Sequence, residues 1–253
     1  SADAQAVVQH EDDMKRARWW LLVLVLVLAG GYLARYQLRA VLTPAQVAIM
    51  RRATIEERLA EHGPSARSRL QARFAAAGVP YPPQSIVLAG FKQEKLVHLY
   101  AAGETNAPRF VHAYPVLAAS GELGPKVAEG DRQVPEGIYR IESLNPNSRF
   151  HLSLRLDYPN QFDRAQAQEE GRQALGGDIM IHGAASSIGC LAIGDPAIEE
   201  LFVLVADVGR EHVSVILSPL ELRSSPLPEA LVSSRPWAPE LYEQVRAALS
   251  ALP

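Results

Sequence analysis

From Pro80 onward the chain is a succession of short β-type runs separated by turn residues, and this pattern decides its fold class. The runs predicted to form strands are Ser85–Ala89, Lys95–Ala101, Phe110–Ala118, Gly137–Ile141, His151–Leu156, Asp178–His182 and His212–Leu217. No internal period indicates repeats. The sequence therefore predicts a mainly β domain with few helices over residues 84–220.

Two helices are expected toward the carboxyl end of the chain. Asp195 is a suitable N-cap residue, Pro196 suits the first helical position, and Gly209 is a typical terminator. A second, amphipathic helix is expected from about Pro239 to Leu252, after a proline-rich linker within residues 221–253.

Near the amino end, residues 19–35 form an apolar stretch that follows Arg18 and closes with Arg35. As a helix, its apolar residues would span roughly 24 Å at ~1.5 Å each, slightly less than the ~30 Å core of a bilayer. The stretch predicts a single-pass membrane anchor, with residues 1–18 as a cytoplasmic tail. A cleaved signal peptide is the alternative, because Ala29–Gly31 offers small residues.

Residues 43–79 have the pattern of two helices rich in arginine and glutamate. Thr43-Pro44 is predicted to begin the first helix, and Gly63-Pro64 is predicted to break it. The second helix is expected from Ser65 to Gly78. We expect a solvated helical spacer that lifts the following domain off the membrane, with a partner-binding surface as the alternative.

The 253 residues carry a formal net charge of -3 and contain a single cysteine. This charge gives no general basic field that would neutralise phosphates, so no nucleic-acid partner is expected. One cysteine excludes a disulfide within the chain and every multi-cysteine zinc pattern. The chemistry of Cys190 therefore involves no second thiol of this chain.

Cys190 follows His182 by eight positions, with small and polar residues turning the chain between them. A thiol with an ordinary pKa of about 8.5 is mostly protonated at neutral pH, so an adjacent imidazole that accepts its proton makes it a better nucleophile. Gly183 and Gly189 permit turns and close substrate approach. The backbone N–H groups of Gly189 and Cys190 are candidate donors to an oxyanion. The pattern favours nucleophilic catalysis by Cys190.

Two other interpretations of this pair stay open. Cys190 could be a buried small hydrophobe, although a lone thiol in an exported protein calls for an explanation, and catalysis provides one. The other is a metal site of His182 and Cys190 with His151 or His212. No helix carries paired ligands, however, and no close carboxylate completes that set. We expect neither a metal nor a cofactor.

The segment from His182 to Cys190 resembles the active-site signature of the YkuD-type L,D-transpeptidases, in which His-Gly precedes Ser-x-Gly-Cys. The Pro-x-Gly-x-Tyr core of that family is matched at Pro135–Tyr139. Further elements are similar to its YafK-like branch: Gly124-Pro125-Lys126, Gly130-Asp131, Ser148-Arg149-Phe150, and Tyr158-Pro159-Asn160 with Asp163-Arg164. The resemblance covers roughly Ser85 to Leu217.

This resemblance implies a YkuD-like β-sandwich domain that acts on peptidoglycan stem peptides. Cys190 would attack the carbonyl of the third stem residue, expel the terminal D-alanine and pass the acyl group to an amine of a neighbouring stem. His182 would serve as the base. Gly183, Ser187 and Gly189 complete the implied catalytic set. The candidate substrate-binding residues are Lys126, Arg149, Tyr158, Asn160, Asp163 and Arg164.

Two positions depart from the better-known members, which carry His two residues before the cysteine and Arg two after it. Here those positions are Ile188 and Ala192, so Arg149 or Arg164 is a candidate to hold the substrate carboxylate. The YafK-like branch includes enzymes thought to release wall-attached protein, so a hydrolase or amidase with the same thioacyl intermediate is the alternative function. A catalytically silent wall-binding module is a third. Each of these functions belongs in the periplasm.

Overall fold

The computed structural model describes residues 19–32, 52–103 and 107–253, and the chain divides into two units, Ser1–Arg52 and Ala53–Pro253.

In the first unit, residues 19–32 form a helix whose apolar side chains are largely exposed. Among the residues that the structure describes, no helix is both long enough and apolar enough to cross a membrane. The predicted anchor over residues 19–35 is therefore not supported. The end of that stretch and the helix start expected at Thr43 lie outside the described residues.

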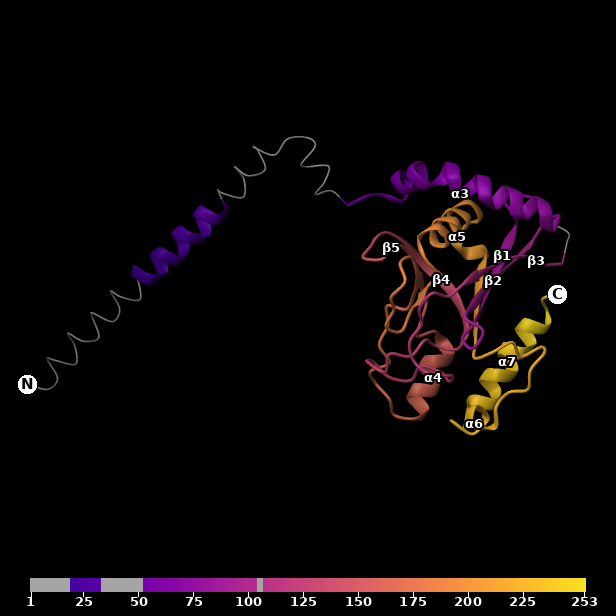
Figure 1. Ribbon diagram of the computed structural model, residues 1–253. Helices are drawn as coiled ribbons and strands as arrows, with labels where there is room; N and C mark the ends of the chain where they lie inside the picture. Colours follow the sequence, from indigo (N-terminus) through magenta and orange to yellow (C-terminus); the bar gives the residue numbers. More distant parts are fainter. Residues whose placement is uncertain (1–18, 33–51, 104–106) are drawn as a thin grey trace, which may run out of the picture. The chain divides into compact units, whose positions relative to one another are not determined.

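The second unit is built on one mixed sheet of eight strands, in the order β3-β2-β1-β8-β4-β5-β6-β7. Strands β1 to β5 are labelled in Figure 1. The strands are β1 Ser85–Phe91, β2 Leu96–Ala102, β3 Arg109–Pro115, β4 Gly137–Ser148, β5 His151–Leu156, β6 Met180–His182, β7 Leu191–Ala192 and β8 Val213–Ser218. All seven predicted strands are present, with shifts at their ends. The eighth, β7, was not predicted because two residues are too short to show alternation.

Strand β4 joins the two halves of this sheet. Residues 137–140 pair with β8, whereas the rest of β4 pairs with β5 through two register shifts. Buried side chains from both halves meet in one core cluster with helix α5 (Asp195–Val208). A sheet domain with several helices therefore fits the prediction, but the expected sandwich is one continuous sheet that changes partner along β4.

Helix α3 (Ile55–Ala77) corrects the prediction of a solvated, broken spacer. It begins at Thr54, which forms a capping box with Glu57, and it continues through Pro64 to a left-handed Gly78. A proline inside a helix removes one backbone hydrogen bond, yet burial of Ala66, Leu70 and Phe74 on one face fixes this segment against the core. The sequence pattern around Gly63-Pro64 was overridden by tertiary packing.

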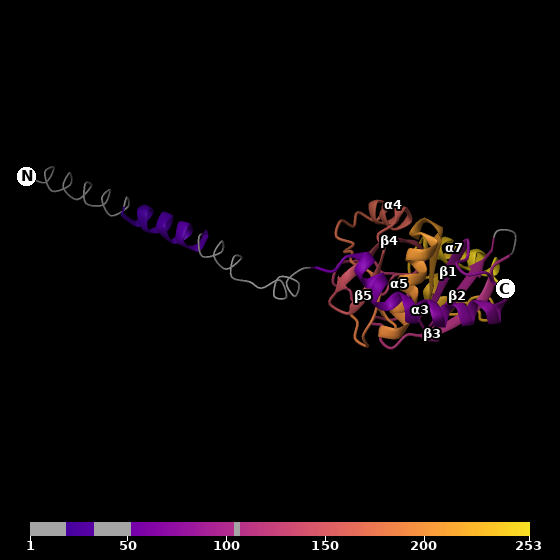
Figure 2. The same cartoon turned by 90° about the horizontal axis from the view of Figure 1, so that it is seen from above.

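Ion pairs also attach α3 to α5, over which it lies (Figures 1 and 2). Glu200 on α5 is 1% exposed, and its carboxylate accepts hydrogen bonds from Arg69, Arg73 and Tyr114. Farther along α5, Asp207 accepts two hydrogen bonds from the guanidinium of Arg67, at 2.8 and 2.6 Å. The helix expected to be solvent-exposed is thus part of the domain.

The opposite face of the sheet is covered by α7 (Ala238–Ser250), which confirms the predicted carboxyl-terminal helix. The short helix α6 (Glu229–Val232) packs against α7. The Tyr242 hydroxyl on α7 donates to Glu136 at 2.7 Å, and Lys92 pairs with the same carboxylate at 2.9 Å. The segment 221–253 is therefore bonded to the loop that precedes β4. Helix α4 (Gln161–Glu169) and a short 3-10 turn (Arg210–His212) were not predicted.

Candidate active site

His182 ends β6 and is held from both sides of the strand, because Ser153 of β5 and Ala192 of β7 are its register partners. Its side chain is buried, and its Nδ1 lies 2.7 Å from the carbonyl oxygen of Gly183. A carbonyl can only accept, so Nδ1 carries the proton in the neutral ring. The buried Nε2, which is then an acceptor, has no hydrogen-bond partner among the described residues. Burial lowers the pKa of His182, so the ring is neutral near pH 7.

The chain turns sharply after His182, and Asp195 at the start of α5 holds this corner. Its Oδ1 accepts the backbone N–H of Ala184 at 2.7 Å, and Ala184 has a left-handed φ of 55°. A Cβ on Gly183 would lie 2.5 Å from the same Oδ1 and 2.7 Å from the carbonyl oxygen of Phe150. Only glycine fits there. Gly194 is the N-cap instead of the predicted Asp195, whose carboxylate is free for this role.

Cys190 lies immediately before β7 and is half-buried. Ala192 pairs with His182 and Leu191 with Ile181, so Cys190, just before the first paired residue of β7, lies two register positions from His182. The Cys190 Sγ donates to the carbonyl oxygen of Asp178 at 3.5 Å. No hydrogen bond joins Sγ to the imidazole among the described residues. The fold thus places Cys190 at the start of the strand that pairs with β6, without a hydrogen bond between its thiol and His182.

The electrostatics of Cys190 keep its thiol protonated at neutral pH. Burial raises the pKa of the thiol, and this effect outweighs the backbone N–H of Met180, which lowers it. The Asp178 carboxylate also raises the pKa of Cys190, whereas the Lys126 ammonium lowers it. A nucleophile in this state needs a base when it reacts.

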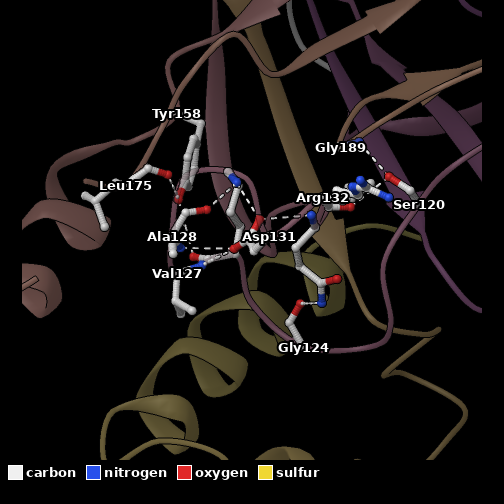
Figure 3. Close-up of polar contacts among 12 residues, drawn as sticks. Ser120, Gly124, Val127, Ala128, Asp131, Arg132, Tyr158, Leu175 and Gly189 are labelled. Atoms are coloured by element: carbon white, nitrogen blue, oxygen red, sulfur yellow. Dashed lines mark hydrogen bonds and ion pairs between the residues drawn. The ribbon is translucent and has the colours of Figure 1, made fainter. Parts of the chain in front are cut away.

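Two serine hydroxyls already occupy the amides that were expected to bind an oxyanion. The Cys190 N–H donates to Ser187 Oγ at 2.9 Å, and the Ser187 hydroxyl donates to the Cys190 carbonyl at 2.7 Å. The Gly189 N–H donates to Ser120 Oγ at 2.6 Å, and Ser120 donates to the carbonyl of Arg132 (Figure 3). Both predicted oxyanion donors therefore already have a hydroxyl partner. Gly189 has a φ of 88°, which explains the glycine.

Lys126 is buried in the loop before β4, where its contacts are internal. Its Nζ donates to the Ala128 carbonyl at 2.7 Å and to Asp131 Oδ1 at 2.5 Å. Asp131 also accepts the backbone N–H groups of Val127 and Ala128, so one carboxylate organises the turn seen in Figure 3. The Lys126 ammonium is therefore hydrogen-bonded within this turn. It affects the pKa of Cys190 through its charge.

The next three candidate residues have scaffold contacts. The Tyr158 hydroxyl donates to the backbone carbonyls of Lys126 and Leu175, and Figure 3 shows Tyr158 beside Leu175. Asn160 caps α4 in a capping box with Asp163. Burial raises the pKa of Asp163 to about 6. These side chains bond to the scaffold within the described residues, and their contact with a substrate stays a prediction.

The arginines differ from these three residues. Arg149 and Arg164 are exposed, and within the described residues neither guanidinium has a hydrogen bond or ion pair. Arg149 lies in the β4–β5 turn next to Phe150, whose ring stacks on His182 at 4.4 Å, whereas Arg164 lies on α4. Arg132 is likewise exposed, and its backbone adjoins Gly189. Arg132 was not predicted, because no motif marks it.

The strand that ends at His182 and the turn that leads to Cys190 are both present, as the sequence predicted. The YkuD family profile, described as "L,D-transpeptidase catalytic domain", matches residues 87–215, just over half of the chain. The chain belongs to this family, and the predicted family is confirmed.

Curated relatives place the chain near the YafK-like branch. It is 35% identical over 138 residues to "Putative L,D-transpeptidase YafK" of Escherichia coli K12, which covers 52% of this chain and 53% of the relative. The O157:H7 relative gives the same values. The chain thus spans about half the length of the curated relatives it matches.

Two solved structures have a weaker likeness. One is the helical cell shape determining protein Pgp2 from Campylobacter jejuni, with TM-score 0.44 and 24% identity, covering 54% of this chain and 48% of that one. The other is L,D-transpeptidase 1 from Mycobacterium tuberculosis, with TM-score 0.30 and 14% identity, covering 53% and 62%.

Proposed function

We propose that this chain is a peptidoglycan L,D-transpeptidase that forms a thioacyl intermediate on Cys190, with His182 as base. The observation that carries the proposal is the free, buried Nε2 of His182 on β6, which pairs with the strand that begins directly after Cys190. The Gly183 carbonyl fixes the proton on Nδ1, so Nε2 is the basic atom. A neutral imidazole and a protonated thiol are the matched starting states for general-base catalysis. Membership of the family supports a stem peptide as substrate.

The first half-reaction requires the thiol to leave Asp178. Rotation of the Cys190 side chain breaks the 3.5 Å contact with that carbonyl and turns Sγ toward Nε2. Nε2 takes the thiol proton while sulfur attacks the carbonyl carbon of the donor stem. The tetrahedral intermediate then expels the terminal amino acid, whose nitrogen receives the proton from the imidazolium. The product is a thioester on Cys190 and a neutral His182.

The second half-reaction repeats the same proton path. His182 takes a proton from the acceptor amine, nitrogen attacks the thioester, and the carbon–sulfur bond breaks. The proton then returns from Nε2 to the sulfur. Water in place of the amine gives the hydrolase or amidase, with identical roles for both residues. In either case an oxyanion would take the Cys190 N–H by displacing the Ser187 hydroxyl.

Arg132 and Arg149 are the proposed carboxylate-binding residues. One adjoins the nucleophile turn and the other adjoins the ring that stacks on His182, and both guanidiniums are exposed. A guanidinium pairs with a carboxylate through two parallel hydrogen bonds. Arg132→Ala and Arg149→Ala should raise the stem-peptide concentration needed for half-maximal acylation, whereas Arg164→Ala on α4 should not. Equal behaviour of all three variants would contradict this assignment.

The proposed substrate also sets the compartment. Peptidoglycan lies outside the cytoplasmic membrane, so this activity requires the catalytic domain there. A protein attached to the wall is a further proposed substrate, because its linkage offers the same carbonyl chemistry.

The test is covalent trapping of the full chain. Incubation with a stem tetrapeptide or a carbapenem should shift the intact mass by one acyl group located on Cys190. Cys190→Ser and His182→Ala should lose or greatly slow the shift, while His212→Ala, an exposed histidine elsewhere, should retain it. A folded wild-type chain without any adduct would favour the silent wall-binding module.

Digestion of purified sacculi then separates the two enzymatic outcomes. New 3-3 cross-links that depend on Cys190 identify a transpeptidase. Loss of attached protein, or shortened stems without new cross-links, identifies the hydrolase or amidase.

A further inference from the structure

Three side chains from distant parts of the chain converge outside the thiol site. His62 lies on α3, His151 begins β5, and Glu199 lies on the second turn of α5. One ligand atom of each lies within 4.8 Å of the others. We infer that they form a zinc-binding site that braces α3, β5 and α5, an inference independent of the proposed function.

The distances suit a tetrahedral transition metal. Glu199 Oε1 lies 3.0 Å from His151 Nε2 and 3.4 Å from His62 Nδ1. Ligand atoms about 2.0–2.1 Å from a tetrahedral zinc lie roughly 3.3 Å from one another. Two imidazoles and one carboxylate, with water in the fourth position, are a ligand set that zinc accepts.

Neighbouring side chains are placed to hydrogen-bond the proposed metal ligands, as is usual around a metal site. His62 Nε2, on the far side of the ring from the proposed metal, is buried without a hydrogen-bond partner among the described residues. Glu61 Oε2 lies 3.6 Å from this atom. Metal on Nδ1 would fix the proton on Nε2, which a small rotation would bring to the Glu61 carboxylate. Arg69 approaches the other oxygen of Glu199 at 3.6 Å and leaves Oε1 for the metal.

Simple hydrogen bonding is the competing explanation. Both rings could donate to Glu199 Oε1, which accounts for the 3.0 Å distance. It leaves His62 Nε2 buried and unsatisfied, whereas metal binding gives that atom a role. The three side chains are 13%, 26% and 18% exposed, so an ion can enter and still be held away from bulk water.

Zinc binding is to be measured on the full chain carrying Cys190→Ser, which removes the competing thiol. Dialysis against zinc sulfate should leave one zinc per chain, and the thermal midpoint should rise with zinc and fall on chelation. His62→Gln and His151→Asn should weaken binding by more than about 100-fold, and Glu61→Gln by ~10- to 100-fold. Asn suits position 151, whose φ is 72°. His212→Ala is the matched control and should bind as the parent does.

Cobalt(II) gives a second readout that needs no substitution of the proposed ligands. The parent should develop the visible absorption of a four-coordinate cobalt site, displaced by one equivalent of zinc. Absence of zinc retention and of this spectrum in the folded parent would overturn the inference. Parental zinc affinity in His62→Gln and His151→Asn would overturn it as well.

Discussion

Two buried polar side chains, Glu200 on helix α5 and His182 beside it, differ in how many hydrogen bonds they make. Glu200, on the α3 side, accepts hydrogen bonds from two guanidiniums and a tyrosine hydroxyl. His182, near the first turn of α5, keeps Nε2 without a partner among the described residues. An unmade buried hydrogen bond costs about 1–3 kcal/mol, so the domain forgoes stability at one place and not at the other. Under the proposed function, this cost is retained because the free Nε2 is needed as a base.

Backbone geometry separates the two regions in the same way. Helix α3 has a regular capping box at Thr54 and a left-handed glycine at its end. The loops around Cys190 instead place non-glycine residues at positive φ, namely Arg132, Asp178 and Ala184. Such strained backbone conformations persist only where contacts with neighbouring residues hold them in place. The α3–α5 region is therefore built for stability and the β6–β7 edge for positioning.

Removing both guanidiniums from Glu200 should give the largest effect. Arg69→Ala with Arg73→Ala leaves a buried carboxylate with only the Tyr114 hydroxyl, and we expect about 3–5 kcal/mol less free energy of unfolding in urea. Adding Glu200→Gln should recover part of this loss. A change below about 1 kcal/mol would show that the α3–α5 ion pairs contribute little, and the contrast with the thiol site would fail.

Asp195 is the place where the two regions meet, because it belongs to α5 and holds the turn after His182. Asp195→Ala removes the acceptor for the Ala184 N–H and should cost about 1 kcal/mol of stability. Acylation of Cys190 should slow more, by ~10- to 100-fold, since a small displacement of a catalytic group is costly. Asp195→Asn keeps an acceptor and should be closer to wild type. Equal slowing by both variants would point to the charge instead of the hydrogen bond.

The fold was predictable where local pattern and tertiary packing agree. The seven strand predictions rested on β-type runs bounded by turns, and α7 rested on an amphipathic repeat. The α3 prediction was wrong at Gly63-Pro64. These residues usually end a helix, but the burial of Leu70 and Phe74 in the core, which the local sequence does not show, keeps this helix continuous. Strand β7 is too short to carry any periodic signal.

Only the part of the site that lies within one short segment of the sequence was predictable. The spacing of His182 and Cys190 and their family motif predicted a strand that ends at His182 and a turn that leads to Cys190. The contacts of Ser120 with Gly189 and of Asp195 with Ala184 join residues far apart in sequence, so no spacing marks them. For the same reason the hydroxyls that occupy the amides of Gly189 and Cys190 were not anticipated.

A smaller effect, which depends on pH, is expected from the unpartnered imidazole of His182. Burial lowers the pKa of His182 from its ordinary 6.5, so Nε2 stays basic at lower pH than a free histidine. The acid limb of the Cys190 acylation rate should therefore lie below pH 6.5. In the unfolded chain this histidine binds a proton at higher pH than in the folded one, so its contribution to stability is present above 6.5 and is lost as pH falls through the folded pKa.

Urea unfolding at about pH 7.5 and about pH 5 measures this contribution. His182→Ala should lose less stability between the two pH values than the wild type. The comparison cancels His98 and His112, whose pKa values burial also lowers. An identical loss in both proteins would mean that His182 titrates as an ordinary exposed histidine.

The smallest effect on stability is expected at the nucleophile itself. Cys190 is half-buried, and its thiol makes one long hydrogen bond, to Asp178 at 3.5 Å. Cys190→Ala should therefore change the free energy of unfolding by only about 0.5 kcal/mol while it abolishes covalent trapping. A loss of about 2 kcal/mol or more would instead assign the sulfur a packing role. The pair of measurements distinguishes the two regions most sharply, because Arg69→Ala with Arg73→Ala should lower stability and leave the trapped fraction of folded protein unchanged.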